Sequence, residues 1–511
     1  MKSMPRRNFF PPILGSCFLA AALLCVAENN AQAADDQVRD TAPPPNVVII
    51  FMDDMGYADI NPFGATGYST PNLNRMAAEG RKFTDFVVSS AVCSASRSAL
   101  LTGCYHRRIG ISGALGPRSD IGIHQDELTI AELCKSKGYR TAVYGKWHLG
   151  HHPKFLPTRH GFDEYYGIPY SNDMWPLHPG AVAKRRKDPN AKIPWAELPM
   201  IEGDRIVNDS LQPEDQQEMT KQFTKRAVEF IKRDPDQPFF LYLPHPMVHV
   251  PLYVSEDFYG KSGRGLFADV MMEIDWSVGQ VLSAIEDIGV ENNTLVVFTS
   301  DNGPWLSYGT HAGKATPLRE GKGTMFEGGY REPTLMWWKG KIPAGSTCDT
   351  FASTIDLLPT IAALIDAELP SHPIDGHDIR PLLFGEPNAQ SPHQSFACYY
   401  GGGLRAVRNE RFKLVFPHQY RTLKGHPGGT AGLPVAYQSA KAVRALYDLD
   451  NDIGETTDVS EQFPEVVSQL ESAAKAYRTE LGDRLTGANQ GPGIRPAGKL
   501  LPGDPRLPLV W

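Results

Sequence analysis

Four apolar segments, each followed directly by polar side chains, restrict the fold of this chain more than any other feature. They span residues 46–52, 141–145, 239–243 and 295–299. Continuous apolar runs of this length are typical of strands that are buried on both faces, as in parallel sheets. Between the last two runs, residues 270–288 carry apolar side chains at helical spacing and end before a glycine. A strand, a helix and a strand in this order predict a crossover unit, and hence an α/β fold.

Composition and length exclude two broad classes of protein. Apolar residues make up 41% of the chain, which is enough to offset chain entropy, so disorder is excluded as the main state. The chain has 51 Lys and Arg against 58 Asp and Glu, for a net charge of −7. This balance argues against a nucleic-acid partner. A length of 511 residues suits one large α/β core together with a smaller domain.

The first 33 residues have the anatomy of a secretory signal peptide. Positive residues stand near the start, a largely apolar segment follows at 9–26, and Ala31-Gln32-Ala33 resembles a cleavage site. We therefore expect an exported protein, periplasmic or extracellular, without a stable membrane span. The alternative is a retained anchor, for which the apolar run is short. Five cysteines follow this segment, too few for a disulfide scaffold. We make no prediction of which disulfides, if any, Cys104, Cys134, Cys348 and Cys398 form.

The polar groups that follow the four runs predict a common site. Ligand sites in open α/β sheets lie at the carboxyl ends of the strands. The groups concerned are Asp53, Asp54, Lys146, His148, His245, His249, Asp301 and Asn302. Carboxylate and amide oxygens are the ligands that Ca²⁺ or Mg²⁺ prefers, so the acidic members indicate a metal site. The alternative for adjacent aspartates is a solvated or capping turn.

A segment that begins at Ala91 carries a resemblance to a known family. Residues 91–103 read AVCSASRSALLTG and resemble the sulfatase signature, in which a cysteine and an arginine precede Leu-Thr-Gly. Further family motifs are matched in order at residues 53–56, 145–150, 300–303 and 321–333. The resemblance covers nearly the whole mature chain and indicates the arylsulfatase A-like branch of the formylglycine-dependent sulfatases. Ala95 replaces the usual proline, and Cys104 stands where an arginine is common.

The resemblance also implies a domain organisation. A catalytic domain at residues 44–388 is expected to have an alkaline phosphatase-like fold, with a large, mixed, mostly parallel sheet flanked by helices. A smaller C-terminal α+β domain with an antiparallel sheet is expected at 389–490, before an extended tail at 491–511. The sequence pattern in the C-terminal region predicts a hairpin of residues 404–407 and 412–416, a strand at 445–449 and a helix from Pro464 to Leu481.

The resemblance implies a modified cysteine and one metal ion. A separate formylglycine-generating or sulfatase-maturing enzyme would oxidise Cys93 to Cα-formylglycine (3-oxoalanine), whose hydrate is a geminal diol. One hydroxyl attacks sulfur, and loss of the proton from the other releases sulfate. One Ca²⁺, with Mg²⁺ as the alternative, is expected to be bound by Asp53, Asp54, Cys93, Asp301 and Asn302.

The same resemblance assigns further catalytic residues. Arg97 lies one helical turn from Cys93, so its guanidinium can reach the diol and the carboxylates. Lys146 and Lys322 are expected to contact sulfate oxygens, and His148 is the expected base. His249 is expected to touch the sulfate or the bridging oxygen, with His245 as the rival. Asp301 and His249 are both candidates to protonate the leaving oxygen.

Substrate recognition is less visible in the sequence. Five residues could contact a sugar, with loop packing as the alternative reading: Asn172, Asp173, Trp175, Trp305 and His311. We expect the partner to be a sulfated small molecule or glycan, and we make no prediction of the oligomeric state. One alternative function is a phosphate or phosphonate monoester hydrolase of the same superfamily. The other is an inactive sulfated-glycan-binding protein, should Cys93 stay a thiol.

Overall fold

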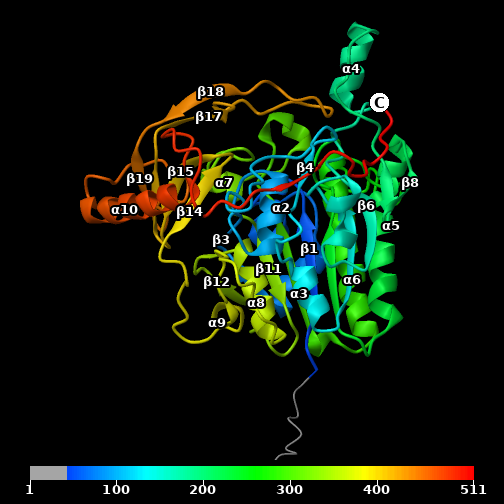
Figure 1. Cartoon of the computed structure of the whole chain (residues 1–511), viewed down its shortest axis with the longest axis horizontal. Helices are drawn as coiled ribbons and strands as arrows, with labels where there is room; N and C mark the ends of the chain where they lie inside the picture. The colour runs from blue at the N-terminus through cyan, green and yellow to red at the C-terminus, as the bar shows by residue number, and fades with distance from the viewer. Residues whose placement is uncertain (1–42) are drawn as a thin grey trace, which may run out of the picture. The chain divides into compact units, whose positions relative to one another are not determined.

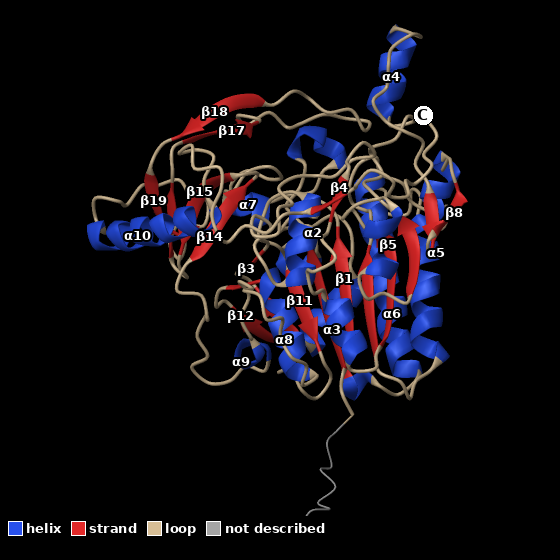
Figure 2. Ribbon diagram, in the orientation of Figure 1, coloured by secondary structure: helices blue, strands red, loops and turns tan. Residues whose placement is uncertain are grey.

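A ten-stranded mixed sheet lies at the centre of the catalytic domain (Figure 2). The computed structural model describes residues 43–511, so the predicted signal peptide lies outside the described residues. Five parallel strands are adjacent in the middle of the sheet: β10 (Thr294–Ser300), β1 (Asn46–Met52), β9 (Phe239–Pro244), β5 (Arg140–Lys146) and β6 (Glu164–Ile168). Four of them are the four apolar runs, so the prediction of parallel, doubly buried strands is confirmed.

Shorter strands extend the sheet on both sides and make it mixed. Next to β10 follow β11 (Thr334–Trp337), β2 (Arg81–Phe83) and β12 (Ser346–Cys348). Next to β6 follow β7 (Met200–Glu202) and β8 (Arg205–Asn208). Strand β11 is antiparallel to β10, and β7 is antiparallel to β6. The expected mixed, mostly parallel sheet is therefore present.

Each face of the sheet is covered by helices. Val48, Ile50 and Met52 of β1 belong to one apolar core, and the alternate residues of β1 belong to another. The first core includes α1 (Pro71–Glu79), α5 (Pro213–Arg233) and α6 (Leu266–Asp287), the predicted crossover helix. The second includes α3 (Ile130–Ser136) and α8 (Leu357–Leu364), with part of α2 (Cys93–Thr102). Figure 1 shows α2 and α3 in front of β1.

The C-terminal domain has its own antiparallel sheet. Its strands are β14 (Phe396–Tyr400), β15 (Gly403–Arg408), β16 (Phe412–Val415) and β19 (Ala445–Asp448), and α10 (Pro464–Leu481) packs on β15 and β16. The predicted hairpin, strand and helix are all present. A separate two-stranded ribbon, β17 (His418–Thr422) and β18 (Gln438–Ala442), arches away from this sheet (Figure 1).

The remaining elements are short. They are β3 (Phe86–Val87) paired with β13 (Ala352–Ser353), α4 (Pro179–Lys187), α7 (Glu327–Tyr330) and α9 (Arg380–Leu383). The tail returns over the catalytic domain, where β20 (Gly498–Lys499) pairs with β4 (Ile121–Gly122). Within residues 43–511, no helix is both long and apolar enough to span a membrane. The five cysteines of this range are all unpaired and buried.

A buried ionic cluster joins the two domains. The Arg408 guanidinium of β15 contacts Asp85 of the catalytic domain at 2.6 Å and Glu327 at 3.2 Å. Lys413 of β16 contacts Glu327 at 2.9 Å and Glu455 at 2.8 Å. All five side chains are buried. Both ion-pair partners of Arg408 belong to the catalytic domain, so its buried charge is paired only while the domains are docked, and docking is sensitive to the loss of this residue.

We therefore expect Arg408→Ala to destabilise the protein strongly. The substitution leaves Asp85 and Glu327 buried without this partner, and breaking a buried pair in this way costs about 3–5 kcal/mol. Urea denaturation of the variant would measure the free energy of unfolding. Arg444→Ala is the matched control, because Arg444 pairs with Glu471 on the surface and its loss should cost less than about 1 kcal/mol. Equal losses in the two variants would contradict the role given to the cluster.

Candidate active site

A cavity of about 190 Å³, partly open to solvent, lies beyond the carboxyl ends of the central strands. Cys93, at the start of α2, lines it together with residues from the loops after β5, β6, β9 and β10. The full lining is Val92, Cys93, Ala114, His148, Ser171, Asp173, Met174, His249, Trp305, Lys322, Tyr400 and Arg421. Parallel strands end at the same edge of the sheet, which explains how residues some 270 positions apart gather here.

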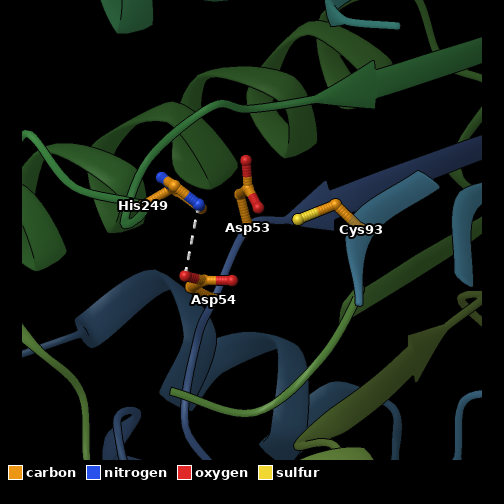
Figure 3. Close-up of side chains that lie close together, drawn as sticks. All are labelled: Asp53, Asp54, Cys93 and His249. Carbon is orange, nitrogen blue, oxygen red and sulfur yellow. Dashed lines mark ion pairs between the residues drawn. The ribbon is translucent and has the colours of Figure 1, made fainter. Parts of the chain in front are cut away.

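Two aspartates stand at the base of this site. Asp53 and Asp54 follow β1 directly and are buried, and one ligand atom from each lies within 4.8 Å of Cys93 Sγ and a ring nitrogen of His249. Figure 3 shows the four side chains converging, with His249 Nε2 3.5 Å from Asp54 Oδ2. Asp54 has a left-handed backbone conformation with φ 60°, which a non-glycine residue adopts only where the surrounding structure holds it.

Asp301 and Arg97 form the back of the site. The Arg97 guanidinium contacts Asp301 Oδ2 at 2.8 Å and Asp53 Oδ1 at 3.6 Å. Asp301 Oδ1 accepts a hydrogen bond from the backbone N–H of Asp54 at 3.2 Å. The side-chain amide of Asn302 donates its N–H to Asp54 Oδ1 at 2.7 Å, so the carbonyl oxygen of the Asn302 side chain takes no part in this bond. The fourth strand end therefore meets the first, as the sequence predicts.

Two lysines complete the charged cluster. Lys146 Nζ donates to Asp53, and it also donates to Ser171 Oγ at 3.1 Å. Lys322 Nζ donates to Asp54 Oδ1 at 2.6 Å and lies 3.3 Å from Cys93 Sγ. Three carboxylates thus face three permanent cations, the third being Arg97. The protein charges of the cluster balance, so a bound divalent cation would give the site a net positive charge that attracts an anion.

The oxygen atoms of this cluster fit a divalent metal ion. Asp53 Oδ1, Asp54 Oδ2 and Asn302 Oδ1 are buried and have no hydrogen-bond partner among the described residues. Buried polar oxygens are almost always satisfied, so three together indicate a missing positive ligand. Burial, reinforced by Asp53, raises the pKa of Asp301 to about 7 despite the opposing Arg97. A cation among these carboxylates would favour their charged forms, and the hard oxygen donors suit Ca²⁺ or Mg²⁺.

Cys93 is held as a neutral thiol in this environment. Its side chain is 2% exposed. Burial raises the pKa of the thiol to about 12, although Lys146 and Lys322 act in the opposite direction. A thiolate is the nucleophilic form of cysteine, so the unmodified side chain is poorly suited to attack at neutral pH. Position 93 is therefore well placed for chemistry but is not activated for it as a cysteine.

His148 has the hydrogen bonding of a base. Its Nε2 is 2.8 Å from the backbone carbonyl of Leu115, which can only accept, so Nε2 carries the proton. Burial, with Lys146 and Arg97, places the pKa of His148 well below its usual range. The neutral ring therefore presents a free lone pair at Nδ1, which is buried and has no partner in residues 43–511.

The two histidines after β9 occupy different places. His249 lines the cavity, and its Nδ1 lies 2.6 Å from the carbonyl of Val250, which leaves Nε2 directed at Asp54. His245 is not among the lining residues, and its Nε2 contacts Ser277 Oγ at 3.1 Å in the core. The geometry thus favours His249 over its rival for contact with a ligand.

The five predicted sugar contacts divide into two groups. Asp173 and Trp305 line the cavity. Asn172 donates to Gln216 Oε1 and to the carbonyl of Pro251, each at 3.2 Å, and the buried Trp175 donates to the carbonyl of Leu211 at 3.0 Å. His311 is half-buried and does not line the cavity. The loop-packing alternative therefore describes Asn172 and Trp175, because both side chains are buried and donate their N–H groups inside the protein.

Sequence reasoning missed several lining residues. Ser171 directly precedes the predicted sugar contacts Asn172 and Asp173, yet nothing in the sequence indicated its contact with Lys146. Tyr400 and Arg421 belong to the C-terminal domain. Nothing in their local sequence links them to the strand ends, because only the docking of the two domains brings them to the cavity.

Comparison with known sequences agrees with this geometry. The Sulfatase family model matches residues 45–367, and a model described as the C-terminal region of aryl-sulfatase matches residues 391–491. Arylsulfatase A of Bos taurus is 38% identical over 456 residues, which cover 85% of this chain and 87% of that protein. N-acetylgalactosamine-6-sulfatase of Canis lupus familiaris is 38% identical over 387 residues, covering 73% and 72% respectively.

Solved structures share the fold. The crystal structure of the PsFucS1 sulfatase from Pseudoalteromonas sp. superposes with a TM-score of 0.76 at 25% identity, covering 88% of this chain and 92% of that one. A phosphonate monoester hydrolase of Agrobacterium radiobacter, at 20% identity and a TM-score of 0.54, covers 84% of this chain and 94% of its own, and shows the fold alone. The predicted family is confirmed by these matches: the chain is an enzyme of the sulfatase family.

Proposed function

We propose that this sulfatase releases inorganic sulfate from a sulfated carbohydrate, and that it uses a formylglycine made from Cys93 and one Ca²⁺. The observation that carries the proposal is the meeting of Cys93 and Lys322, which line the cavity, with Asp53 and Asp54, each of which has a buried carboxylate oxygen that accepts no hydrogen bond from the described residues. A carbohydrate substrate is supported by the relatives named N-acetylgalactosamine-6-sulfatase. It is also supported by the solved structure of Ps i-CgsB in complex with k-i-k-neocarrahexaose, at 27% identity and a TM-score of 0.69.

The residues around the cavity would hold the two groups as follows. Asp53, Asp54, Asp301 and Asn302 would bind Ca²⁺ together with position 93, and the ion would add positive charge and make a hydroxyl at that position more acidic. A hydrated aldehyde at position 93 would supply that hydroxyl. The N-terminal end of α2 begins at the same residue, and helix N-termini favour bound anions.

The side chains of the cavity clamp the sulfate group and move protons. Lys322 lines the cavity and supplies positive charge to the sulfate oxygens, which holds the sulfur against position 93. Lys146 is buried behind the lining residue Ser171 and adds its positive charge from there. His148 Nδ1 accepts a proton from a hydroxyl at that position, because its lone pair is free. We assign protonation of the leaving oxygen to His249, since it lines the cavity, whereas Asp301 is bound by Arg97 and by the N–H of Asp54.

Export and maturation belong to the same proposal. The charged start, the apolar segment and Ala31-Gln32-Ala33 support a signal peptide at residues 1–33, and hence a periplasmic or extracellular enzyme. A formylglycine-generating enzyme would be a transient partner. Since Cys93 is 2% exposed in the folded protein, that enzyme would have to act before this part of the chain folds.

The modification is tested directly by mass spectrometry. Trypsin should release residues 83–97, and conversion of the thiol to an aldehyde lowers the mass of this peptide by about 18 Da. We expect the shift in protein made together with a maturing enzyme. We also expect Cys93→Ala to fold but to lose activity on 4-nitrophenyl sulfate by about 10³-fold or more.

Cys134→Ala is the matched control for this experiment. Cys134 is a buried cysteine of α3 and does not line the cavity, so its loss should leave turnover largely unchanged. An unshifted peptide in protein that shows no turnover would support the inactive glycan-binding alternative. Faster hydrolysis of 4-nitrophenyl phosphate than of the matched sulfate would support the phosphate or phosphonate monoesterase alternative.

Calcium binding is tested by stability as well as by activity. We expect chelation to abolish turnover and to lower the melting temperature, and Ca²⁺ to restore both. At a hundred times its Kd, a ligand that binds only the folded state adds about 2.7 kcal/mol to the free energy of unfolding. Asp54→Asn should remove most of this stabilisation, while the exposed Asp450→Asn should keep it. Equal calcium-dependent shifts of the melting temperature in both variants would rule out the proposed ligand set. A larger stabilisation by Mg²⁺ than by Ca²⁺ would identify Mg²⁺ as the bound ion.

His148 predicts an unusual acid limb in the pH profile. Burial and nearby cations lower its pKa well below 6.5, so the neutral, proton-accepting form persists at acidic pH. We expect kcat to be maintained as the pH falls through 6.5. His148→Ala should lower kcat by about 10²–10⁴-fold, the range typical of a lost base, whereas the exposed His426→Ala should not. A kcat that halves near pH 6.5 in the parent enzyme would argue against His148 as the base.

A further inference from the structure

A second cleft opens beside the catalytic cavity. It has a volume of about 340 Å³ and lies between the loop 323–325 and the ribbon of β17 and β18. Tyr400 and Arg421 line both the cleft and the cavity, so the two spaces are neighbours that share a wall. A substrate longer than one sugar unit would therefore have a place to extend when its sulfate group is in the cavity.

Arg421 forms a rigid part of this wall. Its Nε donates to the backbone carbonyl of Lys322 at 2.9 Å. Its guanidinium lies 4.7 Å from the ring centre of Tyr437 and 5.9 Å from that of Trp305. These contacts fix Arg421 in place, and they connect the ribbon to the loop that carries a catalytic lysine.

Arg405 of β15 differs from Arg421 because its charge has no counterpart. Its side chain lines the cleft and is half-buried, and it makes no ion pair or side-chain hydrogen bond with any residue of the described chain. Asp483, the acid that acts on it electrostatically, is already bound by Arg478 at 2.9 Å and by the backbone N–H of Leu404 at 3.0 Å. Burial lowers the pKa of Arg405, but an arginine remains charged at neutral pH.

The rest of the cleft suits a carbohydrate. Tyr400, Tyr420 and Tyr437 line it, and Gln419 and Gln438 add amides. The hydroxyls of Tyr420 and Tyr437 already accept hydrogen bonds inside the protein, whereas the structure gives the Tyr400 hydroxyl no such partner among the described residues. Aromatic rings offer apolar contact to the C–H faces of a sugar, while the hydroxyls and amides can pair with its polar groups. A half-buried guanidinium without a partner is costly to maintain, and a carboxylate or a sulfate would satisfy it with charge-assisted hydrogen bonds.

We propose that the cleft is a second anion-binding subsite, in which Arg405 binds a carboxylate or sulfate on the sugar unit next to the one that is hydrolysed. This inference rests on the proposed function, and it narrows the substrate class to glycans with anionic groups on adjacent sugars. Arg405 is thus a specificity-determining residue, distant from the reacting sulfate, and its contribution should appear only with substrates that reach the cleft.

Paired ligands that differ in one anionic group test this proposal. The first pair is a chondroitin 6-sulfate trisaccharide that ends in the sulfated hexosamine, and the same compound with its uronate carboxyl reduced to an alcohol. The second pair is a neocarrabiose with a sulfate on both sugars or on one. Calorimetry on the parent and variant proteins, each also carrying Cys93→Ala so that the ligands are not hydrolysed, would give Kd for each ligand. The same proteins with Cys93 intact would report turnover of 4-nitrophenyl sulfate. In the parent enzyme, we expect that, in at least one pair, the ligand with the additional anionic group binds about 10-fold more tightly than the ligand that lacks it.

Arg405 variants show whether this preference arises in the cleft. In Arg405→Ala the two members of the pair should bind equally, while kcat and KM for 4-nitrophenyl sulfate stay within about two-fold of the parent values. Arg405→Lys should retain part of the preference, and the surface variant Arg444→Ala all of it. The pair that responds identifies the anion as carboxylate or sulfate.

Two outcomes overturn the subsite. One is equal binding within both pairs by the parent enzyme, and the other is a preference that survives in Arg405→Ala. Failure of the proposed function has a different signature. In that case the parent enzyme does not hydrolyse 4-nitrophenyl sulfate, whereas the calorimetric comparison of the pairs can still be made.

Discussion

The balance of three buried carboxylates against three buried cations is the constraint on which the site depends. Asp53, Asp54 and Asp301 would repel one another without Arg97, Lys146 and Lys322. An isolated charge in such a place costs several kcal/mol, so each member requires the others. The six residues come from strand ends, from α2 and from the loop before α7, and the parallel order of the central strands brings them to one edge. The parallel order of the central strands therefore determines both the architecture of the sheet and the gathering of the charged residues in the site.

The central strands could be predicted from the sequence, but the edges of the sheet could not. Strands β1 and β10 are buried on both faces, and each contains a continuous apolar run, Val47 to Met52 and Leu295 to Phe298, that makes it easy to recognise. Strands β7 and β8 have three and four residues and a mixed burial pattern, so they carry no comparable signal. The ribbon of β17 and β18 is half-exposed, and its pairing depends on position rather than on hydrophobic periodicity.

The part of the site that follows the central strands could be predicted from the sequence, but the part that comes from the C-terminal domain could not. Residues that follow directly on a buried strand, such as Asp53 and Asp301, have their positions set by local geometry. Tyr400, Arg405 and Arg421 reach the cavity or the cleft only through the docking of a second domain. That docking rests on buried contacts such as Arg408 with Asp85, which lie 323 positions apart in the chain and leave no local pattern.

Domain docking also positions Lys322, the lysine that we propose to contact the sulfate group. The loop that carries Lys322 is held on one side by the contact of Lys322 with Asp54 at 2.6 Å. On the other side, the backbone N–H of Glu327 donates to Glu455 at 2.7 Å and Arg421 binds the Lys322 carbonyl. Two of these three anchors come from the C-terminal domain. Because the proposed contact of Lys322 with a sulfate oxygen would tolerate little displacement, we infer that the second domain helps to set the geometry of the active site as well as lining the cleft.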